Sequence, residues 1–284
     1  MNNEFLETIV ECMATNKEMS NIQKVQTEHR VKLVEFWGIK EGSRVLEIGC
    51  GQGDTTAVLA YFVGEKGLVH GIDSASLTYG SPISLGDSAE YLMQSKLGKQ
   101  IKFDFEIDLL SSNSLEIIED YFDYIVFSHC SWYLKSLDEL RELMQKIKKW
   151  GKQLCFAEWD SRIKTIEQYP HLLSILIQAQ YESFKDDSVS NIRTLFTPKD
   201  IKSIVESSGW TIINDETIDC PELQDGNWEI NKVVIDIEDE LNKTSDIPIK
   251  LKELIQSEVM LLEEFINSNQ VKPLPTYAFI AVKQ

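Results

Sequence analysis

One glycine-rich segment limits the folds open to this chain more than any other. The letters VLEIGCGQG, residues 45–53, end an apolar run typical of a strand, and a helical pattern that stops at Gly64 follows them. Glycine has no Cβ, so the backbone can turn sharply there and a ligand can come close to it. We therefore expect a strand, a tight turn with a ligand site, and a helix over residues 43–64.

The rest of the chain repeats this alternation of short apolar runs and helical patterns. Strands are predicted at residues 44–49, 68–73, 102–108, 122–128, 154–160, 211–218 and 276–282. The run YIVF is apolar at every position, which fits a strand covered on both faces. The pattern predicts an α/β fold in which a parallel sheet lies between two layers of helices.

Helical additions interrupt the alternation in three places. Residues 1–40 have the pattern of an N-terminal helical cap, and residues 41–284 that of one domain with insertions at about 161–196 and 221–270. Between the insertions, Thr197 followed by proline predicts a helix start, because threonine caps helices and proline suits the first helical position. We expect the additions to act as lid segments over the carboxyl edge of the sheet.

The charge balance excludes several classes of partner. Lys and Arg number 28 and Asp and Glu 46, which gives a formal net charge of −18. Nucleic acids and anionic membrane surfaces attract clustered cations, so neither is an expected partner. The chain also shows no apolar run long enough to span a membrane and no secretory signal in its first residues, MNNEFLETIVEC. We expect a cytoplasmic monomer or homodimer that binds small molecules.

The cysteines and histidines indicate neither a disulfide framework nor a metal site. The five cysteines are odd in number and widely spaced, and no CxxC occurs. The four histidines are far apart, and none forms an HxxxH pattern. We therefore predict no bound metal.

The glycine spacing and two carboxylates narrow the choice of ligand. The turn has the pattern GxGxG, Glu47 lies two residues before Gly49, and Asp73 ends the next strand. A dinucleotide fold would carry GxGxxG, so the spacing disfavours a dehydrogenase. A carboxylate about twenty residues after such a turn can accept hydrogen bonds from both hydroxyls of a ribose. A turn residue without ligand is the alternative interpretation of Asp73.

This stretch resembles the first cofactor motif, LEIGCGxG, of the Rossmann-like (class I) S-adenosylmethionine-dependent methyltransferases. The resemblance covers about residues 43–160, and the later predicted strands extend it to the C-terminus. It implies a seven-stranded, mostly parallel sheet in the order 3-2-1-4-5-7-6, with strand seven antiparallel, and S-adenosylmethionine as cofactor. A ligand crevice is expected beside strand one, where the strand order reverses.

The resemblance also implies roles for individual residues. The backbone of the turn would pass under the methionine and ribose portions of the cofactor: Gly49, Cys50 and Gly51. Glu47 would help to hold the ammonium group of the cofactor. Asp73 would bind the ribose hydroxyls, with Ser74 beside it.

The adenine end of the cofactor is expected after the third strand. By resemblance, Asp108 would accept a hydrogen bond from the adenine amino group, and Leu109 would offer its N–H to the ring. Glu106 competes with Asp108 for this role. We prefer Asp108 because the alternation from Phe103 to Ile107 predicts a strand that ends there. A helix cap is the alternative role for Asp108.

The segment FSHCSWYL, residues 127–134, resembles the fourth motif of small-molecule methyltransferases. Ser128 would face the methionine portion of the cofactor. His129 is our candidate general base, because imidazole titrates near neutral pH, and a structural histidine is the alternative. Two tryptophans are candidates for the wall of the acceptor pocket or for helix-to-sheet packing, Trp132 and Trp159. Tyr133 is a weaker candidate for a base or for orienting the acceptor.

The expected reaction is in-line displacement of the sulfonium methyl group by a small-molecule acceptor, mainly through alignment of the two reactants. A base is needed only if the acceptor must lose a proton. Methylation of a protein side chain and non-catalytic binding of S-adenosylmethionine by a sensor are the competing functions. Weaker candidates for the acceptor side are Glu158, Tyr169, His171, Tyr181, Arg193 and Trp228.

Overall fold

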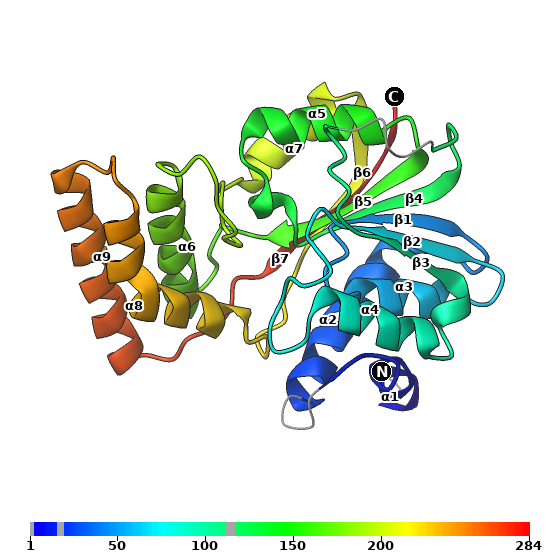
Figure 1. The fold of residues 1–284 in the computed structure, drawn as a ribbon, viewed down its shortest axis with the longest axis horizontal. Helices are drawn as coiled ribbons and strands as arrows, with labels where there is room; N and C mark the ends of the chain where they lie inside the picture. Colours follow the sequence, from blue (N-terminus) through cyan, green and yellow to red (C-terminus); the bar gives the residue numbers. More distant parts are fainter. Residues whose placement is uncertain (1–2, 16–19, 112–116) are drawn as a thin grey trace.

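The computed structural model describes residues 3–15, 20–111 and 117–284. Its strands form one sheet in the order β3-β2-β1-β4-β5-β7-β6, which confirms the predicted order (Figure 1). β7 pairs antiparallel with β5 and β6, and the other neighbouring strands pair in parallel. The strands are β1 (Arg44–Ile48), β2 (Leu68–Ile72), β3 (Ile101–Asp104), β4 (Phe122–Ser128), β5 (Gly151–Trp159), β6 (Trp210–Ile218) and β7 (Thr276–Lys283).

Helices cover both faces of the sheet, and a further group lies beside it (Figure 1). One face carries α1 (Asn3–Val10), α2 (Ser20–Trp37), α3 (Asp54–Val63) and α4 (Leu85–Gln94). The other face carries α5 (Leu137–Ile147) and α7 (Pro198–Ser207). The group beside the sheet consists of α6 (Tyr169–Glu182), α8 (Asp225–Lys243) and α9 (Ile249–Ser268), which share a small core of their own.

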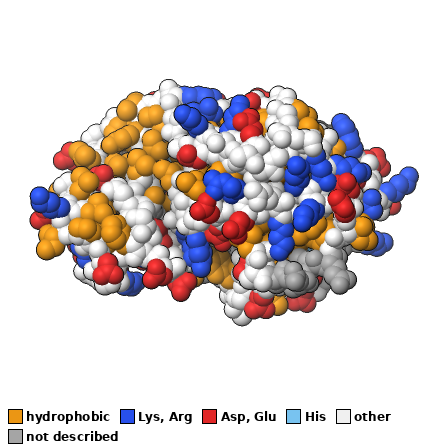
Figure 2. All heavy atoms as spheres, turned by 90° about the horizontal axis from the view of Figure 1, so that it is seen from above, with side chains coloured by type: hydrophobic (Ala, Val, Ile, Leu, Met, Phe, Trp, Pro, Cys, Tyr) orange, Lys and Arg blue, Asp and Glu red, His pale blue; other side chains and the backbone are white. Residues whose placement is uncertain are grey.

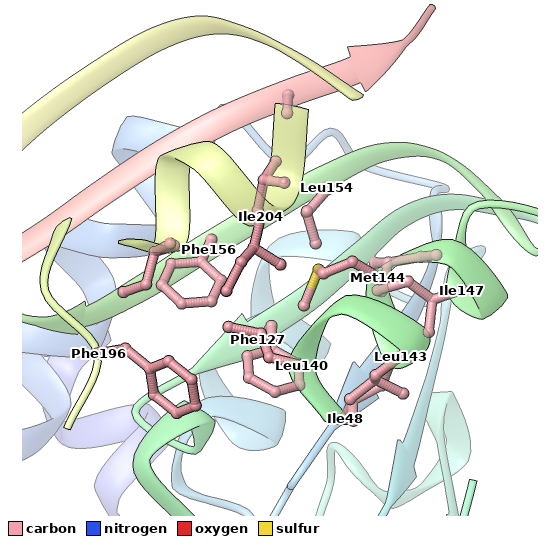
Figure 3. Packing of buried hydrophobic residues seen from close by; sticks show 14 of the residues in the cluster. Ile48, Phe127, Leu140, Leu143, Met144, Ile147, Leu154, Phe156, Phe196 and Ile204 are labelled. Carbon is pink, nitrogen blue, oxygen red and sulfur yellow. The ribbon is translucent and has the colours of Figure 1, made fainter. Parts of the chain in front are cut away.

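The main core lies between the sheet and the helices α5 and α7. Figure 3 shows Leu140 of α5 and Ile204 of α7 over the rings of Phe127 and Phe156. Those two rings stack across β4 and β5 with centroids 5.6 Å apart, and Phe156 stacks on Phe279 of β7 at 4.9 Å. Burying each such ring stabilises the folded state by roughly 1.5–3 kcal/mol. The apolar run in β4 is therefore covered on both faces, as its sequence predicts.

The helix start at residue 197 is also confirmed. The Thr197 hydroxyl accepts a hydrogen bond from the Asp200 N–H at 3.3 Å, and the Asp200 carboxylate accepts one from the Thr197 N–H at 3.0 Å. Pro198 occupies the first helical position. This reciprocal capping satisfies backbone donors that a helix end leaves unpaired.

The predicted third strand is wrong at its end. The sequence alternation predicts a strand over 102–108, but β3 ends at Asp104. Glu106 has a φ of 59°, a left-handed conformation that a strand cannot contain. The ring of Phe103, in the strand, stacks on that of Phe105, just beyond its end, with centroids 5.6 Å apart. Asp108 consequently lies in a loop four residues beyond the strand.

Charged side chains of both signs are interspersed over the face shown in Figure 2, and apolar side chains gather toward the end where Figure 1 shows α6, α8 and α9. α9 exposes Leu254, Met260 and Leu261, and α8 exposes Ile235. No helix in the described part of the chain is long and apolar enough to cross a membrane.

Candidate cofactor and acceptor site

In the turn after β1, the backbone is packed closely against a neighbouring side chain at Gly49 and has open space beside it at Gly51. Gly49 and Gly51 have φ values of 71° and 52°. The N–H groups of Gly49 and Cys50 donate to the Ile72 carbonyl at 2.8 and 3.1 Å, which ties the turn to the end of β2. A Cβ on Gly49 would lie 2.7 Å from the Cβ of Cys130, whereas a Cβ on Gly51 would have no neighbour within 4 Å. The backbone at Gly51 is therefore open to a ligand.

The two cysteines next to the turn are packing residues. Cys50 is 5% exposed, and burial raises the pKa of its thiol. Burial likewise raises the pKa of Cys130, whose Sγ–H donates to the Ile48 carbonyl at 3.1 Å. A raised pKa disfavours the reactive thiolate, so neither side chain is a nucleophile here.

Asp73 lies beside the open turn, directly after β2. Its Oδ2 accepts a hydrogen bond from the Gly51 N–H at 2.8 Å, and its Oδ1 accepts one from the Ala75 N–H at 2.9 Å. A carboxylate has about four acceptor positions, so each oxygen keeps one for a ligand. The neighbouring Ser74 is exposed.

Glu47 is a buried carboxyl on β1, with 2% exposure. The Thr56 hydroxyl donates to its Oε2 at 2.5 Å. Burial raises the pKa of Glu47 to about 8, even though the Thr56 hydrogen bond and the positive charge of Arg30 oppose the shift. The group is thus mostly protonated at neutral pH, and a bound cation would favour its ionisation.

Asp108 occupies the loop after β3 and is exposed. Its Oδ1 accepts hydrogen bonds from the Leu110 and Ser111 N–H groups at 2.9 and 3.3 Å. The Ser111 side chain and these N–H groups lower the pKa of Asp108. Asp108 therefore caps a turn, whereas the alternative role left open by the sequence was a helix cap, and Leu109 is buried behind it. Their contacts with adenine stay predictions.

Ser128, at the end of β4, carries a buried polar atom that suits a ligand. Its Oγ has no hydrogen-bond partner among the described residues, although the side chain is only 9% exposed. Buried hydroxyls ordinarily have partners, so an unpaired one indicates a group that this structure lacks. Three features together suit a bound S-adenosylmethionine: the unpaired hydroxyl of Ser128, the open backbone at Gly51 and the spare acceptor positions of Asp73.

His129 follows Ser128 with a φ of 51°, a conformation that is strained for a residue with a Cβ. Its N–H donates to the Ala157 carbonyl at 2.8 Å, which holds the strained turn against β5. The Nε2 atom lies 3.1 Å from Nε2 of His29, and the Nδ1 atom lies 3.6 Å from Oε1 of Glu158. Strain of this kind is often found at functional residues.

Sequence reasoning did not assign His29 to the site. His29 is on α2, 1% exposed, and its Nε2 also lies 3.2 Å from the Thr276 hydroxyl. Burial lowers the pKa of His29 well below its usual value. The sequence feature that could have pointed to His29 is its position on the same helix face as Leu33 and Trp37, which are buried.

Glu158 is a buried carboxylate that accepts three hydrogen bonds. It is 2% exposed and accepts hydrogen bonds from the N–H and the hydroxyl of Ser131 at 3.0 and 2.7 Å. The Trp159 N–H donates to its other oxygen at 2.9 Å. These three donors compensate the burial of its charge and fix its position behind His129.

The three predicted aromatic residues have different surroundings. Trp132 is 3% exposed, packs in the main core and donates its indole N–H to the Phe196 carbonyl at 3.2 Å, so its pocket role is corrected to packing. Tyr133 is exposed. The Trp159 ring lies 4.6 Å from that of His129 and is parallel to that of His29 at 6.4 Å. Trp159 therefore forms one wall beside the imidazoles.

The insertions contact this region through polar side chains that the sequence did not single out. Gln26 of α2 donates to Asp225 of α8 at 2.5 Å. One turn further along α8, Glu229 accepts from Gln178 of α6 at 2.7 Å and from Asn191 at 3.4 Å. Such contacts join segments up to 199 residues apart, and local sequence patterns do not report them.

The weaker candidates are mostly structural. His171 is fully buried and accepts the Leu274 N–H at 2.8 Å, and burial lowers its pKa to about 3. Tyr181 is buried in the core of the helical group, and Arg193 donates to a carbonyl of the 131–133 turn at 3.4 Å. Tyr169 packs on a ring of α9, and Trp228 is exposed. Within the described ranges, no three His, Cys, Asp or Glu side chains gather as a metal site would require.

Known proteins share both this sequence pattern and this fold. A family model described as a methyltransferase domain matches residues 22–214. A demethylmenaquinone methyltransferase of Bacillus cereus is 29% identical over 132 residues, which are 44% of this chain and 49% of the relative. The chain thus spans about half the length of the curated relatives it matches.

Solved structures extend the likeness to the whole chain. A cyclopropane-fatty-acyl-phospholipid synthase-like protein from Lactobacillus casei has a TM-score of 0.87 and 30% identity, over 99% of this chain and 100% of that one. A phosphoethanolamine N-methyltransferase of Haemonchus contortus has a TM-score of 0.50 and 17% identity, over 90% of this chain and 52% of that one, and shows the fold alone. This chain belongs to the methyltransferase-domain family, in its Rossmann-like, S-adenosylmethionine-dependent class.

Proposed function

We propose that this chain is an enzyme that transfers a methyl group from S-adenosylmethionine to a small-molecule acceptor. The observation that carries the proposal is the open turn at Gly51 with the Asp73 carboxylate beside it. The two spare acceptor positions of that carboxylate suit the two hydroxyls of a ribose. The matched family supports the same cofactor.

Residues of β1, of the turn after it and of the end of β4 would hold the cofactor. The backbone of the turn would lie under its methionine and ribose portions: Gly49, Cys50 and Gly51. Glu47 would ionise beside its ammonium group, and the Ser128 hydroxyl would gain the partner that it lacks. When bound, S-adenosylmethionine supplies a methyl group on a positively charged sulfur.

His129 is the proposed general base on the acceptor side. Its Nδ1 faces the fixed Glu158 carboxylate, an arrangement that orients the ring and stabilises the imidazolium formed when Nε2 takes up a proton. Trp159 would wall the pocket and exclude water, and the exposed Tyr133 lies at its rim.

The acceptor is proposed to be polar. Carboxylates and amides of α2, α6 and α8 meet near the site: Gln26, Gln178, Asp225 and Glu229. The relatives' names point to different acceptors, demethylmenaquinone in one and a fatty-acyl phospholipid in another, so they do not fix the acceptor of this chain. We further propose a cytoplasmic monomer or homodimer without nucleic acid or membrane partners, in line with the net charge of −18.

Calorimetry tests the cofactor, and turnover tests the enzyme. We expect micromolar binding of S-adenosylmethionine and S-adenosylhomocysteine and no binding of NAD; binding of NAD alone would refute the proposal. Release of S-adenosylhomocysteine is then followed with a panel of small amines, alcohols, phenols and carboxylates, and with a protein extract as the competing substrate. Stimulation by the extract alone would favour a protein methyltransferase, and binding without any stimulated turnover would favour a sensor.

A further inference from the structure

Helix α2 places a second imidazole against the proposed base. We propose that His29 is a positioning residue: it holds His129 with Nε2 unprotonated until an acceptor that bears an O–H or N–H group replaces it as the hydrogen-bond donor. This inference rests on the proposed function and deepens it, because it names the chemical class of the acceptor.

The surroundings of the pair decide which nitrogen carries the proton. The Glu158 carboxylate can only accept hydrogen bonds, and its Oε1 lies 3.6 Å from Nδ1 of His129, beyond hydrogen-bond distance. Its negative charge favours the tautomer of His129 that carries a hydrogen on Nδ1. A neutral imidazole with Nδ1–H has a lone pair on Nε2. The hydrogen between the two Nε2 atoms, 3.1 Å apart, therefore belongs to His29.

His29 has a second acceptor within reach. Its Nε2 lies 3.2 Å from the Thr276 hydroxyl oxygen, nearly the same distance as that to His129. An N–H at this nitrogen is therefore within hydrogen-bond distance of both groups. Burial lowers the pKa of His29, which keeps the ring neutral in both arrangements. His29 remains hydrogen-bonded to Thr276 when another donor occupies Nε2 of His129.

This exchange selects acceptors that carry a transferable hydrogen. An amine, alcohol or phenol donates its N–H or O–H to Nε2 of His129 in the place of His29. As the acceptor heteroatom forms its bond to the methyl carbon, the bond from that carbon to sulfur would break and leave S-adenosylhomocysteine, and the proton of the acceptor would pass to Nε2. The ring becomes an imidazolium, and its Nδ1–H stays directed at the negative charge of Glu158. The π bond of an alkene has no hydrogen to donate and is a poor match for this site.

Nitrogen NMR on the histidine rings tests the arrangement without need of an acceptor. The chain has only four histidines, so single His→Gln variants assign every ring signal. In the full chain with S-adenosylhomocysteine, His129 is expected to show a protonated Nδ1 and an unprotonated Nε2. His29→Phe, which keeps a ring and removes the donor, should convert this signal into a mixture of tautomers. His29→Gln, which keeps an N–H donor, should restore it.

Two controls isolate the hydrogen bond from packing. His70→Gln removes a buried imidazole of β2 whose partner is Asp104 at 2.7 Å, and it should leave the His129 signal unchanged. Thr276→Val should also leave the tautomer unchanged, because it removes only the second acceptor of His29. A protonated Nε2 on His129 in the wild type, or an unchanged tautomer in His29→Phe, would overturn the inference. If His29→Phe does not fold, the wild-type and His29→Gln spectra decide.

Turnover separates this inference from the proposed function. With an acceptor found in the panel, His29→Phe should lower kcat roughly tenfold or more and His29→Gln much less, with the Kd for S-adenosylhomocysteine within about twofold. Equal losses in both variants would indicate packing and overturn the positioning role. If no acceptor is found, the enzyme proposal fails, and the NMR spectra still decide the role of His29.

Discussion

Replacing Glu47 with glutamine should stabilise the free protein and weaken its hold on the cofactor. Burial raises the pKa of Glu47 to about 8 from an ordinary value of 4.5. Between these values the native state binds a proton that the unfolded state has lost, so the free energy of unfolding falls as pH rises. Each pH unit in this window costs about 1.4 kcal/mol. Glutamine has nearly the same shape as glutamate and can form hydrogen bonds, but it does not ionise, so the variant does not lose unfolding free energy in this way as pH rises.

The magnitude follows from the two pKa values. From about pH 5 to about pH 7, the wild type should lose about 2.5 kcal/mol of stability relative to Glu47→Gln, and little further difference should develop above the native pKa. Chemical denaturation of both proteins at several pH values measures this difference directly. Glu206→Gln, on the exposed face of α7, removes the same charge without burial and should show no such trend.

The same variant should bind S-adenosylmethionine less tightly, because glutamine cannot ionise beside an ammonium group. Loss of a hydrogen bond between charged groups costs about 1.5–3 kcal/mol, or roughly 10- to 100-fold in Kd. Stability and affinity would then change in opposite directions at one residue. A stability difference between Glu47→Gln and wild type that is flat across pH would refute the reasoning, because it would mean that the buried carboxyl is already ionised in the free protein.

Further predictions concern the cofactor turn and one helix cap. Binding of S-adenosylmethionine at about pH 7 should release about 0.9 proton, because Glu47 with a pKa near 8 starts about 90% protonated. Calorimetry in buffers of different ionisation enthalpy measures the number of protons released. No release would contradict the assigned contact between Glu47 and the ammonium group. Asp73→Ala should weaken binding at least roughly 100-fold with an unchanged circular dichroism spectrum, since a charged acceptor of two hydroxyls is lost, and unchanged affinity would exclude the ribose role. Gly49→Ala should lower the free energy of unfolding by about 1–3 kcal/mol more than Gly51→Ala, because only the former places a Cβ 2.7 Å from a neighbour. Equal losses in chemical denaturation would argue against the close packing at Gly49. Thr197→Ala should cost about 1 kcal/mol in the same assay, and no loss would show that the cap adds nothing.

The proximity of the candidate cofactor residues could be predicted from sequence because they are close along the chain. The turn at Gly49, the carboxyl of Glu47 and the carboxylate of Asp73 follow from two consecutive strands, and parallel strands bring their carboxyl ends together. The error in β3 has a local cause that periodicity does not reveal. Its alternation continues past Asp104, but the left-handed Glu106 turns the chain out of the sheet.

The acceptor half was less predictable because its contacts join distant segments. His29 and His129 are 100 residues apart, and Gln26 and Asp225 are 199 apart. A histidine on a buried helix face has the same sequence signature whether it packs, as His171 does, or meets another imidazole. Only the tertiary arrangement distinguishes the two.

Helix α2 belongs to the site and not only to the core beneath it. Gln23 donates to Asp54 at 2.6 Å, at the start of the helix that follows the cofactor turn, and Gln26 reaches the first residue of α8. Three residues further, His29 meets His129. Residues spaced by three are neighbours on a helix, so one side of α2 contacts the start of α3, the start of α8 and the proposed base. Because the three contacts are made by one helix, specificity at the proposed site would depend on a segment far from it in sequence.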